Sequence, residues 1–317
     1  MDLKHPPAIL IGTPGRVASH LRNDRFSTKD IKTLVLDEFD KSLEAGFTDE
    51  MSEIISLLPS ITKRILTSAT QSIEIPSYVK LHNPNTINHL QETKPQLEIQ
   101  QIISPDKDKL ETLFESLCFL GNKPGIIFCN FRDAIERISS FLQRRNIQHG
   151  CFHGGMEQRD RETALIKFRN GTHQLLIATD LAARGIDIPQ IKYIIHYHLP
   201  AHEHEFTHRN GRTARMFEEG TAYVLRSKAE NLPEFIPPPP VTSIKKAPIP
   251  TSSKWKTLCI TGGRRNKISK GDIVGLFFKK GNILSEQIGL IEVQQQYSFV
   301  AVHGDIAEQL IQKLNRQ

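Results

Sequence analysis

Acidic side chains follow a short apolar run near the start of the chain, where a folded protein could use them for chemistry. Residues 34–36 (LVL) are followed by Asp37, Glu38 and Asp40. An apolar run bounded by charge indicates a buried parallel strand, and carboxylates at its end lie where open α/β sheets bind ligands. In nucleotide-hydrolysing folds this position holds the acid that ligates magnesium and a neighbour that activates water. A plain strand-to-helix turn, capped by Asp40 or Ser42, explains the same residues without chemistry.

A second charged stretch, HRNGRTAR at 208–215, carries two arginines at a spacing that suits phosphate chemistry. Arg212 and Arg215 are three residues apart, so helical or near-helical geometry points both side chains the same way. Arginine fingers stabilise charge on a transferring phosphoryl group, which is worth about 10³–10⁵ in rate. A solvated helix face is the usual explanation of such a segment, but Gly211 and Thr213 interrupt what a solvated helix prefers.

The segment ATDLAARGID at 178–187 leaves an apolar run with residues that suit a nucleotide. Gly185 permits a tight backbone, and Arg184 is available for a phosphate. Asp187 can accept hydrogen bonds from a ribose or from an arginine.

The segment TPGR at 13–16 has the pattern of a helix start. Thr13 is the expected N-cap and Pro14 the first helical residue. With Gly15 and Arg16 beside it, a helix N-terminus can bind a backbone phosphate through its N–H groups and through charge.

Short apolar runs alternate with helical patterns along most of the chain. We expect strands at 8–12, 34–36, 64–70, 125–129, 148–153, 174–179, 193–197 and 220–225, and helices at 13–21, 41–58, 75–81, 107–119, 132–145, 158–170 and 203–209. This order predicts an α/β protein whose parallel sheet is covered on both faces. Residues 85–105 are polar, contain Pro95 and Pro105, and are expected to connect two domains.

The last part of the chain differs in composition from the rest. Residues 231–254 are rich in proline and predict a stiff, extended linker. Beyond it the pattern is strand (257–260), basic loop (262–267), helix (270–279), two strands (288–293 and 298–302) and helix (305–314), which resembles an RRM-like α+β module without its last strand. Residues 241–317 carry 12 Lys and Arg against 5 Asp and Glu, which indicates polyanion binding or a solubilising surface.

Overall composition is that of a globular protein, with 38% hydrophobic and 24% charged residues over 317 positions. No apolar run approaches the roughly 18 residues of a membrane span, so we expect no membrane partner. The four cysteines are scattered without a CxxC pair, which favours reduced thiols in a cytoplasmic protein over a disulfide frame or a zinc site.

Taken together, the motifs resemble those of the DEAD-box ATP-dependent RNA helicases. The matching segments are TPGR (13–16), DEFD (37–40), SAT (68–70), IIFCN (126–130), Gln158 with Arg161, ATDLAARGID (178–187) and HRNGRTAR (208–215). Residues 257–275 resemble the RNA-binding domain of the DbpA subfamily, which acts on large-subunit ribosomal RNA in ribosome assembly. The resemblance implies four segments: the C-terminal part of a first RecA-like domain (1–88), a complete second RecA-like domain (89–230), the linker (231–254) and a DbpA-type domain (255–317).

The resemblance also implies roles in ATP hydrolysis, with ATP and Mg²⁺ as cofactors. Asp37 would hold magnesium, largely through water, and Glu38 would orient the attacking water. The remaining roles are a link to the second domain (Asp40), coupling of hydrolysis to unwinding (Ser68, Thr70), nucleotide contact (Gly185, Asp187), arginine fingers (Arg212, Arg215) and a bridge toward the acidic strand (His208).

The resemblance also implies a further set of residues that would bind RNA. The RNA would be a ribosomal RNA hairpin or duplex, and the protein would act as a monomer. The backbone would be gripped by Thr13, Gly15, Arg16, Arg161, Thr179, Asp180 and Arg184. Backbone contacts carry no sequence information, so we expect specificity from the basic tail. Its phosphate contacts would be Arg264, Arg265, Lys267 and Lys270, with Trp255 and Tyr297 either stacking on bases or packing in the core.

Some features depart from the family pattern. Phe39 stands where the family name implies Ala, Asn210 replaces the usual apolar residue, and Ala214 stands where Gly is commoner. The sequence has no GxxxxGK[ST] motif and no Gly-Lys dipeptide. We therefore expect either a fragment or a gene model cut at both ends, and a chain that does not hydrolyse ATP efficiently alone. A non-catalytic RNA clamp and a DNA-translocating relative stay open as alternatives.

Overall fold

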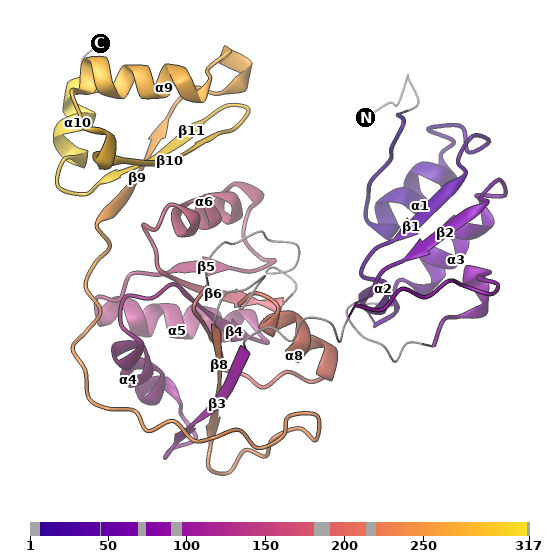
Figure 1. Ribbon diagram of the computed structural model, residues 1–317, viewed down its shortest axis with the longest axis horizontal. Helices are drawn as coiled ribbons and strands as arrows, with labels where there is room; N and C mark the ends of the chain where they lie inside the picture. Colours follow the sequence, from indigo (N-terminus) through magenta and orange to yellow (C-terminus); the bar gives the residue numbers. More distant parts are fainter. Residues whose placement is uncertain are drawn as a thin grey trace. The chain divides into compact units, whose positions relative to one another are not determined.

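The computed structural model describes residues 7–44, 46–68, 74–89, 97–180, 191–213 and 220–315. The chain forms two compact units, residues 1–94 and residues 95–317, which Figure 1 colours from indigo to purple and from magenta to yellow. Among the described helices, none combines the length and the apolar character needed to cross a membrane.

The first unit is built around two parallel strands. Strand β1 (Thr33–Leu36) pairs with β2 (Lys63–Leu66) so that Leu36 lies beside Leu66. Buried apolar residues of helices α1 (Pro14–Arg22) and α3 (Thr48–Ser56) pack together beneath the strands, and the short helix α2 (Phe39–Glu44) follows β1. Ala18 and Leu21 of α1 and Ile54 of α3 are among them, and Leu58 and Ile61, which follow α3, belong to the same cluster.

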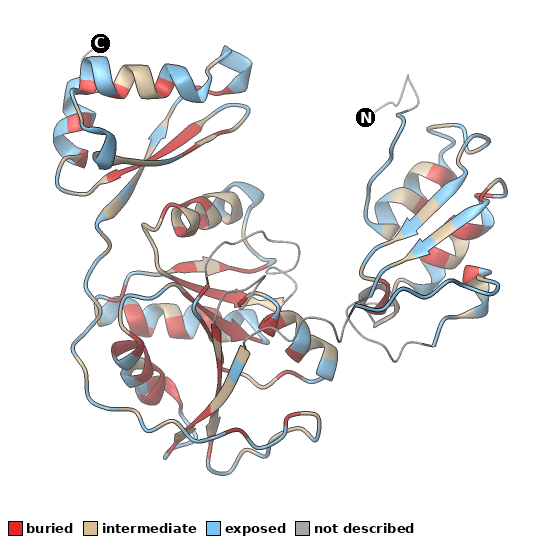
Figure 2. Cartoon of the chain, viewed as in Figure 1, coloured by how far each residue is buried: buried red, intermediate tan, exposed pale blue. Residues whose placement is uncertain are grey.

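The parallel pairing of β1 is confirmed, but its expected burial on both faces is wrong. Val35 is 54% exposed and Ile65 is 37% exposed, because among the described residues the helices cover only the other face of this pair. Figure 2 shows the contrast with the second unit, whose central strands are red. The strand expected at 8–12 does not form in the described chain either, and Ile11 is 90% exposed there.

Two expected helices of the first unit are also corrected. The pattern at 41–58 is split into α2 and α3 by a turn at Gly46, whose φ of 75° is in the left-handed region. The pattern at 75–81 yields only the 3₁₀ turn η1 (Ser77–Val79). Lys80 then adopts a φ of 53°, which ends helical geometry.

The second unit contains a sheet of six parallel strands in the order β3-β8-β7-β4-β6-β5. Its strands are β3 (Leu97–Ser104), β4 (Gly125–Cys129), β5 (Gly150–Phe152), β6 (Leu175–Thr179), β7 (Tyr193–His196) and β8 (Gly220–Ser227). Its described helices are α4 (Leu110–Leu120), α5 (Arg132–Arg144), α6 (Gln158–Arg169) and α8 (Glu203–Asn210), which Figure 1 shows around the sheet. The predicted α/β parallel sheet is confirmed.

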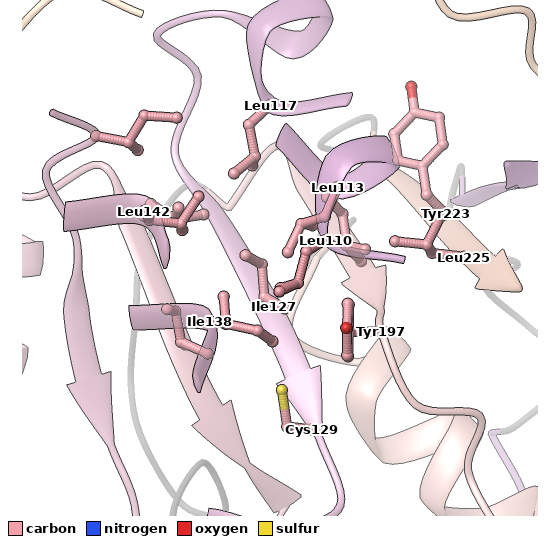
Figure 3. Packing of buried hydrophobic residues seen from close by; sticks show 14 of the residues in the cluster. Leu110, Leu113, Leu117, Ile127, Cys129, Ile138, Leu142, Tyr197, Tyr223 and Leu225 are labelled. Carbon is pink, nitrogen blue, oxygen red and sulfur yellow. The ribbon is translucent and has the colours of Figure 1, made fainter. Parts of the chain in front are cut away.

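Alternate residues of the central strands face two separate cores. Ile127 and Cys129 of β4 pack with residues of α4 and α5, as Figure 3 shows. Ile126 and Phe128 face the other side and pack with Phe168 of α6. Because both faces are covered, these strands are apolar throughout, as buried parallel strands must be.

Strand β3 was missed because its sequence, LEIQQIIS, is partly polar and lies within a segment that reads as a connection. It is the edge strand of the sheet, and residues of the proline-rich segment cover its free edge. Gln101 N–H donates to Pro240 O (2.9 Å), and Thr242 N–H donates to Gln101 O (2.8 Å). Ile236, which belongs to the same proline-rich segment, is buried, with 2% of its surface exposed. The expected spacer is therefore a strap along the second unit, and it protects an edge that would otherwise expose unpaired backbone groups.

The C-terminal module belongs to the second unit and follows the predicted βαββα order. Three antiparallel strands, β9 (Trp255–Ile260), β10 (Ile288–Val293) and β11 (Ser298–His303), are ordered β10-β11-β9. Helices α9 (Lys270–Leu276) and α10 (Ala307–Leu314) cover one face of this sheet. Ser269 caps α9 by accepting from Asp272 N–H, while the Asp272 carboxylate accepts from Ser269 N–H.

Candidate functional site

The acidic turn after β1 is organised by the residue that follows β2. Since Leu36 and Leu66 are register partners, Asp37 and Thr67 leave neighbouring strands at the same edge. The Thr67 hydroxyl donates to Asp37 Oδ1, and the same oxygen accepts from Glu38 N–H (3.1 Å). Phe39 N–H donates to Thr67 O (2.9 Å). Thr67 therefore orients Asp37, although the sequence pattern had singled out only its neighbours Ser68 and Thr70.

Two features of this turn fit a ligand-binding carboxylate. Asp37 is exposed, and no hydrogen bond to its Oδ2 occurs within the described residues. Glu38 has a φ of 47°, a conformation that costs a non-glycine residue roughly 1–2 kcal/mol. Strain of this kind is concentrated at functional sites. Ser68 is exposed next to Thr67, and Thr70 lies outside the described residues.

Phe39, the departure from the family name, points into the core and does not crowd Asp37. Its side chain is 1% exposed and packs in a cluster with Met51 and Val79. Asp40 is also buried, at 4% exposure. The residue after the acidic pair thus starts helix α2 and fixes it to the core.

The N-terminus of α1 is open to solvent. Thr13 occupies the N-cap position with extended backbone, but its side chain makes no capping hydrogen bond. Thr13, Gly15 and Arg16 are all exposed, and a Cβ at Gly15 would meet nothing within 4 Å. The predicted helix start is confirmed, and its first N–H groups and Arg16 are accessible to an anion.

In the second unit, Arg209 of α8 joins the ends of three strands. Its guanidinium donates to both Asp180 oxygens (2.6 and 2.7 Å), to Asn130 Oδ1 (2.7 Å) and to His198 O (2.7 Å). It also lies over the Phe128 ring, 5.4 Å from the centroid. Arg209 is 1% exposed, so this network is a buried, paired charge. Sequence reasoning missed Arg209 and Asn130, although both stand inside recognised motifs.

Asp180 therefore has a structural partner in addition to its predicted role. Both of its oxygens bind Arg209, and its side chain is 18% exposed. Thr179, the last residue of β6, is partly exposed beside it. The predicted contact of these two residues with RNA stays a prediction.

Asn210, another departure from the family pattern, pairs with a buried histidine. Its Oδ1 lies 3.0 Å from His196 Nε2, so Nε2 carries the proton. Burial, reinforced by the charge of Arg209, lowers the pKa of His196 to about 3. His196 is therefore neutral at physiological pH, and the pair fixes α8 against β7.

The end of α8 carries the predicted arginine fingers. The helix stops at Asn210, and Arg212 lies in the following turn, where its N–H donates to Arg209 O (3.1 Å). Thr213 anchors the turn because its hydroxyl donates to Ile191 O (2.6 Å). Arg212 and His208 are both partly exposed. Arg184, Gly185, Asp187, Ala214 and Arg215 lie outside the described residues.

Arg161 sits on the first turn of α6. Its Nε is buried and has no hydrogen-bond partner among the described residues. A buried guanidinium nitrogen normally has an acceptor, which a bound water or a ligand could supply at Arg161. This is consistent with the predicted phosphate contact.

The basic loop of the tail is a tight turn that presents its cations outward. It contains the 3₁₀ turn η2 (Arg264–Asn266), held by Arg264 N–H to Gln294 O (2.8 Å) and Arg265 N–H to Gln295 O (3.0 Å). Only glycine fits at Gly263, where a Cβ would lie 2.3 Å from Gln294 O. All four predicted phosphate contacts are exposed: Arg264, Arg265, Lys267 and Lys270.

Three family models match successive parts of this architecture. Residues 1–77 match the DEAD/DEAH box helicase model, residues 108–217 the helicase conserved C-terminal domain, and residues 257–317 the DbpA RNA binding domain. Together the three family models identify a helicase-type protein.

Similar proteins narrow the class. The chain is 30% identical to ATP-dependent RNA helicase DbpA of Escherichia coli over 99% of its own length and 71% of that protein. It is 34% identical to eukaryotic initiation factor 4A of Caenorhabditis elegans, covering 72% of this chain and 58% of the relative. The chain belongs to the DEAD-box family of RNA helicases and is DbpA-like.

A solved structure agrees with this assignment. Saccharomyces cerevisiae Dbp5 bound to RNA and ADP BeF3 matches with a TM-score of 0.59 and 25% identity, over 69% of this chain and 59% of Dbp5. Apart from DbpA, this chain covers only about half to three-fifths of the length of these relatives.

Proposed function

We propose that this chain provides the acidic, arginine and RNA-recognition parts of an ATP-dependent RNA helicase that remodels structured RNA. The observation that carries the proposal is the buried Arg209 network, which holds the ends of three strands and the α8 turn with Arg212 in one arrangement. A side chain that is held in place in this way, such as Arg212, is suited to stabilising the charge that develops on a phosphoryl group during its transfer.

The residues of the acidic turn fit Mg²⁺ as the cofactor ion. Asp37 Oδ1 is oriented by Thr67 and by Glu38 N–H, while Oδ2 accepts no hydrogen bond from the described residues. Carboxylate oxygen is the ligand type that Mg²⁺ prefers, and it commonly keeps several waters. Bound with ATP, the ion would neutralise charge on the phosphates. Glu38, held in a strained backbone, would orient the attacking water.

RNA is the proposed polymeric substrate. Three positive sites support this proposal: the accessible α1 N-terminus with Arg16, the Arg161 guanidinium, whose Nε has no acceptor among the described residues, and the exposed cations of the tail turn. The first two would grip the sugar-phosphate backbone, and the tail would choose the RNA. From the DbpA likeness we propose a large-subunit ribosomal RNA hairpin as the target, in ribosome assembly.

The oligomeric state and compartment are proposals too. We propose a monomer that acts in the cytoplasm. The latter rests on four cysteines that are all free in the structure.

A non-catalytic RNA clamp is the second candidate, because the sequence has no GxxxxGK[ST] motif. Arg212→Ala separates the two functions. It should abolish RNA-stimulated ATP turnover of a helicase and leave RNA binding intact, whereas a clamp would be unaffected. Turnover is measured on this chain joined to a segment that supplies the missing motif, with the unjoined chain, expected to be inactive, as the control.

RNA binding is tested on the chain as it stands. Deleting residues 255–317 should lower affinity for a ribosomal RNA hairpin and flatten the salt dependence, because each lost phosphate contact removes about 0.7–0.9 from the log–log slope. Fluorescence anisotropy from 50 to 200 mM salt measures both. Equal affinity and slope with and without the tail would refute its role, and a preference for DNA would favour a DNA-translocating relative.

A further inference from the structure

The sheet of the C-terminal module has one face that its own helices leave uncovered. Residues directly opposite in antiparallel strands share a face, and Phe299 is the partner of both Cys259 and Glu292. Ala301 and His303 continue that face, opposite Thr257 and Trp255. The helices α9 and α10 pack on the other face, against residues such as Val300 and Leu258.

An RRM uses this open face to stack bases on its aromatic residues. Here, however, the face is already partly buried. Phe299 is 8% exposed and Ala301 is 1% exposed, although the module's helices lie on the opposite side. The open face therefore has a cover that the module itself does not fully supply.

The cover is the C-terminal end of α6 and the turn that follows it. Thr257 Oγ1 lies 2.7 Å from Thr172 Oγ1 and accepts from Asn170 Nδ2 (3.3 Å). Arg169 Nη1 donates to Glu292 Oε1 (3.1 Å), with both side chains about 30% exposed or less. A Cβ built on Gly171 would be 3.6 Å from the Trp255 ring.

A second contact lies at the other end of the same helix. The Arg159 guanidinium stacks over the Tyr297 ring, 4.8 Å from its centroid. Burial raises the pKa of the Cys259 thiol, and the nearby charge of Arg159 opposes that rise. Arg159 and Arg169 are about 15 Å apart along a helix, so two separated contacts fix the orientation of the module.

We propose that the open sheet face of the C-terminal module is a docking surface for α6 and residues 170–172 of the same chain, and that RNA is bound instead by the outward turn at 264–270. The proposal rests on the proposed RNA function. It assigns Trp255 and Tyr297 to the docking surface and not to base stacking. The segment before the module is fixed to the second unit at two places. It pairs with β3, and the Ser253 hydroxyl donates to Gly171 O, so the module begins next to the end of α6.

Docking has a consequence for recognition. The turn at 264–270 is held on the β10–β11 hairpin, and Tyr297 of that hairpin touches Arg159. The tail cations and Arg161 of α6 are thereby parts of one body. RNA bound by the tail would therefore contact α6 at a fixed position. Binding would not have to order a loosely tethered module, so the entropy cost of that ordering is avoided.

A disulfide locks the docked state and tests it. Thr172→Cys and Thr257→Cys replace two oxygens that lie 2.7 Å apart, and Cys259→Ser removes the neighbouring exposed thiol. We expect the pair to oxidise readily in the whole chain without RNA, and the oxidised and reduced forms to bind a ribosomal RNA hairpin with affinities within twofold. Failure to form the bond, or a tenfold or greater loss of RNA affinity on oxidation, would overturn the proposal.

A second variant tests docking without a cross-link. Thr257→Arg places a large cation between Asn170 and Thr172, and Trp255 is the single tryptophan of the chain. We expect its emission to shift to the red as the face is exposed to water. Gln309→Arg adds the same charge on α10, on the far side of the sheet, and should leave the emission unchanged.

The RNA result and the docking result remain distinguishable. If neither redox form binds RNA, the proposed RNA function fails, while cross-linking and tryptophan emission still decide the docking. An unchanged emission in Thr257→Arg would contradict docking whatever the RNA result.

Discussion

The acidic turn of the first unit and the arginine network of the second unit are built in opposite ways. Asp37 is exposed and is oriented by its sequence neighbour and by Thr67. Arg209 is 1% exposed and donates four hydrogen bonds to groups that follow three different strands. The first site can exchange water for a ligand, whereas the second is completed when the protein folds.

The difference follows from the cost of burying charge. An exposed carboxylate keeps its hydration and needs few partners. A buried guanidinium loses its hydration, and that cost is offset only by well-placed acceptors such as those around Arg209. In the arginine network, the contacts that fix the geometry of the site therefore also stabilise the fold. In the acidic turn, the geometry of the site and the stability of the fold are independent of each other.

Replacing Arg209 gives the largest expected effect. Arg209→Met keeps the apolar stem but leaves Asp180 and Asn130 without their donor, which should cost about 3–5 kcal/mol of unfolding free energy. Urea unfolding combined with hydrogen exchange would show the loss in peptides of β4, β6 and α8. The control is Arg137→Met, which breaks the exposed pair with Asp108 and should cost only about 0–1 kcal/mol. Equal losses in both variants would show that burial does not set the contribution of Arg209 to stability.

Phe39→Ala tests the core beside the acidic turn. The side chain is 1% exposed among Met51 and Val79, so truncation should cost about 3 kcal/mol. Faster hydrogen exchange is expected in the first unit, with the second unit unchanged. Val35→Ala is the matched control because Val35 is 54% exposed, and it should change little. A neutral Phe39→Ala would mean that the family's Ala suits this core equally well.

His196 makes the second unit sensitive to acid. Its pKa is lowered to about 3 from an ordinary value of 6.5, so the folded state resists a proton that the unfolded state accepts. Its contribution is intact above about pH 6.5 and is lost as the pH falls toward 3, at up to about 1.4 kcal/mol per pH unit. His196→Phe should flatten the dependence of unfolding free energy on pH by about one proton. An unchanged slope would contradict this.

The sequence predicted the parallel sheet of the second unit well, because its strands are apolar on both faces. Strand β3 was not predicted, because it is an edge strand whose polar residues Glu98, Gln100 and Gln101 interrupt the apolar pattern. The motifs located Asp37, Asp180 and Arg212, but not what holds them. Thr67 and Arg209 act through pairing between distant segments, and nothing local distinguishes a buried arginine from a solvated one.

The smallest expected effect lies in the acidic turn itself. Glu38 has a φ of 47°, and Glu38→Gly relieves that strain while adding chain entropy to the unfolded state. The two terms nearly cancel, so the unfolding free energy should change by less than about 1 kcal/mol. Lys80→Gly, at a φ of 53° in a segment that carries none of the acidic residues, should change the unfolding free energy by a similarly small amount. Only Glu38→Gly should abolish RNA-stimulated ATP turnover once the GxxxxGK[ST] segment is supplied. If Glu38→Gly lowers stability by as much as Arg209→Met, the acidic turn is also part of the folding core, and the separation between stability and site geometry does not hold there.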